Sequence, residues 1–183
     1  MGLKWLFSTM FAVLAHPEAF WKEGLARREG VNAMRDYAAP VIAMVQLAKL
    51  PLVGVPKPAM ILAIVSFILD VAVLYLLAGA IASAAGSDRK TSLQEEILAT
   101  LCYALTPVWL AELFYFAETW RWLFLVGALL HAFLILKPGL HAMLDLEGPQ
   151  ADTLTGKSAL LTSGASLASF MAMTGLIRIF TSI

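Results

Sequence analysis

Cysteine and charge are both scarce in this sequence. The single cysteine, Cys102, lies in an apolar run, which excludes a disulfide framework and any metal site built from several cysteines. Charged residues make up 14% of the 183 residues, whereas soluble domains average about 25%. The 13 basic residues are balanced by 13 acidic ones, so the basic surface that nucleic-acid binding needs is missing. Because 60% of the residues are hydrophobic, the chain is predicted to be an integral membrane protein rather than a water-soluble domain.

Five apolar stretches are long enough to cross a bilayer, which takes about 20 mainly apolar residues. Prolines, glycines or charges interrupt the chain between them. We therefore predict one all-α membrane domain over residues 1–183, without strands, because the apolar runs are too long to alternate as barrel strands do. The predicted spans cover residues 37–55, 58–85, 93–116, 120–140 and 158–180.

The first 30 residues imitate a secretory signal, with Lys4 ahead of an apolar run. Pro17, however, would lie just after Ala15, the only plausible cleavage point, so we interpret residues 1–30 as two amphipathic helices in the membrane plane. In the second helix, Trp21 marks the apolar edge, which is typical of a helix in the headgroup layer. The first has an apolar stripe of Leu3, Phe7, Met10, Phe11 and Leu14.

The distribution of lysine and arginine predicts the orientation. Nine of them lie before the first span, between spans two and three, or beside the connection between spans four and five. The other side has at most Lys49, Lys57, Arg121 and Arg178. The positive-inside rule therefore places the N-terminus in the cytoplasm and the C-terminus outside.

Two segments and one short motif carry a resemblance to a known family. Residues 16–30 read HPEAFWKEGLARREG, residues 35–51 read RDYAAPVIAMVQLAKLP, and residues 103–107 read Tyr-Ala-Leu-Thr-Pro. These resemble the opening and the Tyr-Ala-x-x-Pro signature of the bacterial branch of the Yip (Ypt/Rab-interacting) family of five-span membrane proteins. The resemblance implies the five-span fold and a multi-pass location in the bacterial inner membrane, but no settled chemistry.

Eukaryotic members of that family are associated with Rab GTPases, and they carry a long cytosolic region with an Asp-Leu-Tyr-Gly-Pro motif. This sequence shows no such region before its first span, and its similar residues 145–149 fall between spans four and five. A Rab-type GTPase is therefore not an expected partner.

Two ionisable residues, Asp70 and His131, lie inside predicted spans, where each needs a partner. At about 1.5 Å per residue, both lie roughly 16 to 18 Å from the outer end of their spans, so we expect them to meet. Such a pair either relays protons or fixes helix register through a hydrogen bond. Tyr103 is a reserve partner for Asp70.

A second candidate pair, Lys49 and Glu112, lies nearer the outer surface. Arg121 is a competing partner for Glu112, and Lys49 and Glu112 could also reach water independently.

Pro107 is expected to kink span three and to free the carbonyl of Tyr103, which a neighbouring group must then satisfy. The kink serves either packing alone or a hinge and polar cavity beside Asp70.

Small residues recur at every fourth position in two spans, which allows close helix approach in lipid. The two predicted packing faces are Ala78, Ala82 and Gly86 in span two, and Gly164, Ala168 and Ala172 in span five.

No catalytic, cofactor or metal site is predicted, since the three histidines are scattered and no nucleophile can be placed beside a base. The favoured function is a non-enzymatic organising factor or accessory subunit that binds lipid and another membrane protein or a second copy of itself. The alternative is a small transporter or channel that uses Asp70 and His131. A polar cavity reaching Asp70 favours transport, whereas a sealed Asp70 favours a scaffold.

Overall fold

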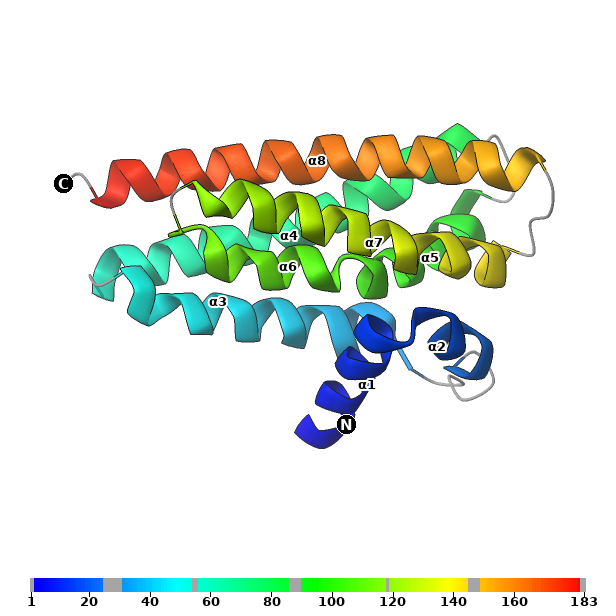
Figure 1. The fold of residues 1–183 in the computed structure, drawn as a ribbon, viewed down its shortest axis with the longest axis horizontal. Helices are drawn as coiled ribbons and strands as arrows, with labels where there is room; N and C mark the ends of the chain where they lie inside the picture. The colour runs from blue at the N-terminus through cyan, green and yellow to red at the C-terminus, as the bar shows by residue number, and fades with distance from the viewer. Residues whose placement is uncertain are drawn as a thin grey trace.

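The computed structural model describes residues 2–24, 31–53, 56–85, 90–117, 119–144 and 149–181. Within these ranges the chain is helical and contains no strand. Figure 1 shows an elongated bundle in which α3, α4, α6, α7 and α8 run along the long axis, with α1 and α2 against one side. The elements are α1 Leu3–Ala15, α2 Pro17–Gly24, η2 Ala33–Ala38, α3 Ala39–Val53, α4 Pro56–Ala85, α5 Lys90–Ala104, α6 Thr106–Ala111, η3 Glu112–Phe114, α7 Trp120–Leu144 and α8 Pro149–Thr181.

Four segments of this bundle are helical, long and apolar enough to cross a membrane. They match the predicted spans two to five, but the fifth begins earlier than expected because α8 starts at Pro149. The polar stretch at residues 141–157, predicted to be a loop, is therefore largely helical, and residues 145–148 lie outside the described ranges. The four segments are Ala59–Ala85, Ser92–Phe114, Trp120–Leu144 and Asp152–Ile179.

The first predicted span corresponds to α3, whose 15 residues fall short of the length of the other four. The six-residue π-helix η2 runs directly into α3. Asn32 and Asp36 cap its start reciprocally: Asn32 Oδ1 accepts from the Arg35 N–H at 2.9 Å, and Asp36 Oδ2 accepts from the Asn32 N–H at 2.9 Å.

The two N-terminal helices are present as predicted, with their break at His16. Leu3, Phe7 and Phe11 are exposed on α1, as an apolar face for lipid requires. The prediction for Trp21 is wrong, because its side chain is 1% exposed and its indole N–H donates to the Ile135 carbonyl of α7 at 3.0 Å. Trp21 is a packing anchor rather than a headgroup residue.

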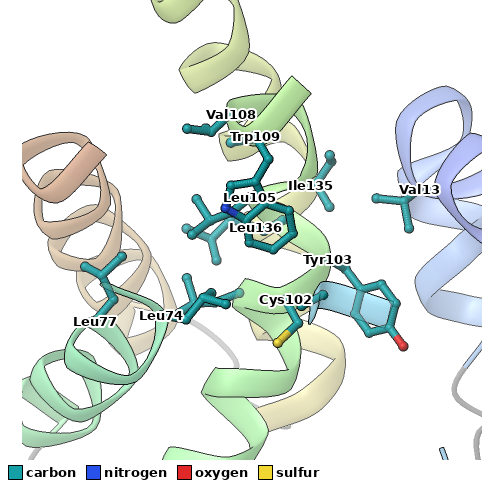
Figure 2. Close-up of a cluster of buried hydrophobic side chains, with 14 of the residues drawn as sticks. Val13, Leu74, Leu77, Cys102, Tyr103, Leu105, Val108, Trp109, Ile135 and Leu136 are labelled. Carbon is teal, nitrogen blue, oxygen red and sulfur yellow. The ribbon is translucent and has the colours of Figure 1, made fainter. Parts of the chain in front are cut away.

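The core centres on the broken helix formed by α5 and α6, in which residues 100–109 are all buried. Figure 2 shows side chains of α4, such as Leu74 and Leu77, approaching this helix from one side and Val13 of α1 from the other. Pro107 ends the regular helix as predicted: α5 stops at Ala104, and Pro107 lies in the first turn of α6. The Tyr103 carbonyl accepts a hydrogen bond from Thr106 Oγ1 at 2.8 Å.

The two small-residue faces have opposite environments. Ala78 and Ala82 of α4 are buried within the bundle, and Gly86 lies outside the described residues. In α8, Gly164, Ala168 and Ala172 are all exposed, so no described part of the chain packs on this predicted face. Another side of α8 packs inward, where Ser158, Thr162 and Ser166 are buried.

Candidate polar site between α3, α4 and α8

Three elements contribute polar side chains to one buried cluster. Gln46 and Lys49 lie three positions apart on α3 and so share a face, while Glu112 begins the short helix η3. Ser66 and Asp70, four positions apart, share a face of α4. All five side chains are buried, and Glu112 is only 2% exposed. We call this group the polar site.

An ion pair holds the site together. Lys49 Nζ lies 2.6 Å from Glu112 Oε2 and 3.2 Å from the Ser66 hydroxyl, so one ammonium group links α3 to both η3 and α4. The same nitrogen lies 5.5 Å from the ring centroid of Tyr115, which adds a cation–π contact. The predicted pairing of Lys49 with Glu112 is confirmed. Arg121 is not the partner of Glu112.

The amide of Gln46 joins the two carboxylates. Its Nε2 donates to Asp70 Oδ2 and to Glu112 Oε2, both at 3.0 Å. Gln46 Oε1, on the other side of the same amide, is buried without a hydrogen-bond partner. Gln46 was not predicted from the sequence, although an uncharged amide within an apolar helix, one turn before Lys49, is the signal that could have found it.

The predicted pairing of Asp70 with His131 is wrong. His131 Nε2 donates to the Leu14 carbonyl at 3.0 Å, so α7 satisfies one of the carbonyls left free at the end of α1. Asp70 meets Gln46 and Glu112 instead. The depth of Asp70 correctly indicated that it needs a polar partner. Depth does not specify how each helix is rotated about its own axis, so it did not identify which residue that partner is.

Tyr103 is not among the described partners of Asp70 either. Its ring packs with Tyr37 at a centroid distance of 4.6 Å and with Phe20 and Trp21 at 5.1 and 5.9 Å. Tyr37 in turn shares a 2.8 Å hydrogen bond with the Thr106 hydroxyl. The Tyr103–Pro107 motif therefore holds the N-terminal helices and the central break together, on a different face from the polar site.

Two small cavities adjoin the polar site. One, of about 20 Å³, is lined by Asp70, Glu112, Tyr115, Ser166 and Ser169 together with apolar side chains. This is enough room for about one water molecule. The other, of about 10 Å³, lies beside Gln46 and Lys49. Asp70 is therefore buried but not tightly sealed.

The inward face of α8 carries five hydroxyl residues that the sequence analysis did not single out. Their spacing of three or four positions places them on one side of the helix. The hydroxyl groups of Thr155, Ser158 and Thr162 are buried without a hydrogen-bond partner. Continuing along the same face, Ser166 and Ser169 reach the larger cavity. We call this the hydroxyl face: Thr155, Ser158, Thr162, Ser166 and Ser169.

The chemistry available at the site is that of charge and hydrogen bonding. The described residues contain no group of three or more histidine, cysteine, aspartate or glutamate side chains that could hold a metal ion. The carboxylates, the amide and the hydroxyls can nevertheless exchange hydrogen bonds with water or with a small ion.

Four membrane-length apolar helices around a buried polar cluster are the features of a multi-pass membrane protein. Comparison with family models, curated proteins and solved structures finds no match to this chain.

Proposed function

We propose that the chain is a non-enzymatic, Yip-like protein of the bacterial inner membrane that acts as an accessory or organising subunit. It binds a membrane-spanning helix of another membrane protein through α8. The observation that carries this proposal is the exposed small-residue face of Gly164, Ala168 and Ala172. Small residues at every fourth position let two helix backbones approach closely in lipid, and nothing within the described chain covers this face.

Replacing Ala168 with leucine tests the partner surface. Because Ala168 is exposed, the larger side chain leaves the packing of the chain intact but keeps a partner helix away. We expect purification in a mild detergent to recover the Ala168→Leu variant folded but with its co-purifying membrane protein reduced about tenfold or more, the equivalent of roughly 1.4 kcal/mol of binding free energy.

Ala72→Leu is the matched control, since Ala72 is an exposed alanine of α4 outside either small-residue face. It should retain the partner. Equal partner recovery from both variants, or a dimer of the chain in place of a second protein, would contradict the proposed subunit role.

The proposed topology has five spans, with the N-terminus in the cytoplasm and the C-terminus outside. It is supported by η2 and α3, which follow one another without a gap and together cover residues 33–53. We therefore expect a reporter enzyme that works only in the periplasm to be active when it is fused after residue 183. A reporter active only in the cytoplasm would require an even number of spans.

A small transporter or channel is the second candidate function, favoured by the cavity that adjoins Asp70 and Glu112. His131 has no part in it, since its ring is engaged with α1.

A further inference from the structure

The polar site contains two acidic side chains and only one basic side chain. Lys49 supplies one positive charge, whereas Asp70 and Glu112 supply two negative charges, which leaves one net negative charge when all three are ionised. Lys49 lies against Glu112, and Asp70 has no ion-pair partner among the described residues. An uncompensated charge is costly away from water, so the site gains stability from one further positive charge.

The space for such a charge lies beside Asp70. The cavity of about 20 Å³ admits one water-sized particle, and the residues that line it include the two carboxylates, Asp70 and Glu112, and two hydroxyl residues, Ser166 and Ser169. Ser166 is only 6% exposed. Neither serine hydroxyl takes part in any described hydrogen bond, so their oxygens are free to bind a ligand. Hard cations prefer ligand shells made of such oxygens.

Gln46 holds the two carboxylates beside this cavity. Its side chain is almost fully buried, and Nε2 donates to both Asp70 and Glu112 at 3.0 Å. The two carboxylates are therefore held close together, where one cation can bind both. Oε1 of the same amide is buried without a partner, and Gln46 lines the smaller cavity.

The backbone around the cavity is also interrupted. Leu105, in the break between α5 and α6, and Val108 in the first turns of α6 line the same cavity. Breaks in membrane-spanning helices are common at ion sites, since they release backbone groups from the helix.

We propose that the cavity between α4, η3 and α8 binds a single monovalent cation, with oxygen atoms of Asp70, Glu112, Ser166 and Ser169 as its ligands. A monovalent ion neutralises the site, whereas a divalent ion would leave an excess positive charge. Ser166 and Ser169 belong to the hydroxyl face of α8, whose hydroxyl groups at Thr155, Ser158 and Thr162 are also buried without partners. This site is independent of the proposed partner surface, which lies on the opposite side of α8.

Thermal unfolding in different salts tests the cation site. The purified full chain in detergent is compared in sodium chloride, potassium chloride and choline chloride of equal ionic strength at pH 8, since choline is too large for the cavity. At a concentration about 100 times its dissociation constant, sodium or potassium should raise the unfolding midpoint by about 5 °C over choline. Radioactive ²²Na⁺ should bind at about one ion per chain and be displaced by unlabelled sodium but not by choline.

Two variants locate the ion. Asp70→Asn keeps the shape of the side chain but removes its charge, and Ser166→Ala removes one ligand oxygen, so both should lose most of the increase over choline. Ser163→Ala is the matched control on α8, because Ser163 lies outside the hydroxyl face, and it should respond as the unmodified chain does. If Asp70→Asn does not fold, Ser166→Ala alone still decides the location.

Equal midpoints in all three salts would overturn the proposal. The proposal would also be overturned if the unfolding midpoint in choline changed with pH between 5 and 9 while sodium and potassium had no effect. A proton shared among the groups of the site would then neutralise it in place of a cation; these groups are Asp70, Glu112, Lys49 and Tyr115. Ala168→Leu should bind the cation normally, so loss of the partner and loss of the ion are separate outcomes.

Discussion

Lys49→Met is expected to destabilise the folded chain by about 3 to 5 kcal/mol. The substitution removes the only positive charge that pairs with Glu112 within the described residues and leaves two carboxylates buried together. Methionine retains most of the volume, so loss of packing contributes little. Reversible unfolding in mixtures of mild detergent and dodecyl sulfate measures the free energy of unfolding directly.

The double variant Lys49→Met with Glu112→Gln separates charge from packing. It has the same net charge at the polar site as the unmodified chain, because one positive and one negative group are removed together. Its stability should recover most of the loss seen with Lys49→Met alone. If Lys49→Met alone is as stable as the unmodified chain, the ion pair contributes nothing to folding.

Gly139→Ala is expected to detach α2 from the bundle. A Cβ atom at this position would lie 2.6 Å from Trp21 Cζ2 and 2.8 Å from Thr100 Cγ2, distances that real Cβ atoms essentially never show. The indole is rigid and also donates to the Ile135 carbonyl, so Trp21 must leave its site. The expected cost approaches that of removing a buried tryptophan, about 3 to 5 kcal/mol.

Limited proteolysis of α2, for example after Lys22, measures this detachment and should be at least tenfold faster in Gly139→Ala. Gly127→Ala is the matched control on the same helix, since a Cβ atom there meets nothing within 4 Å. Equal rates of cleavage in Gly139→Ala and Gly127→Ala would show that the close contact of Trp21 with Gly139 is unimportant. In a Trp21→Ala background, Gly139→Ala should cost less, because only the close contact with Thr100 Cγ2 remains.

Hydropathy and length predicted spans two to five because the energy of burying a helix in lipid depends mainly on composition, and composition is read directly from the sequence. Depth along a helix follows from the rise per residue, and it placed Lys49 near Glu112. The free carbonyl of Tyr103 was identified because Pro107, four residues later, has no N–H to donate to it.

Rotation about the helix axis was not predictable in the same way. Asp70 and His131 lie at similar depths but on helices turned toward different neighbours, and Gln46 took the place that His131 was expected to fill. In α8, small residues and hydroxyl residues form two opposite faces, and either can pack in lipid. Spacing alone does not decide between them. In the structure the hydroxyl face turns inward, and its Ser166 and Ser169 line the same cavity as Asp70.

The anchoring of α1 and α2 has a consequence for the order in which the protein is made. His131 and Ile135, which receive these helices, lie 117 and 114 residues after Leu14 and Trp21. At about 5 to 20 residues per second, the ribosome adds that length in roughly 6 to 23 seconds. During this interval the indole N–H of Trp21 and the carbonyl of Leu14 lack their hydrogen-bond partners in the nascent chain. The first helices to be synthesised are thus among the last to reach their final contacts, and they close the bundle only after α7 has entered the membrane.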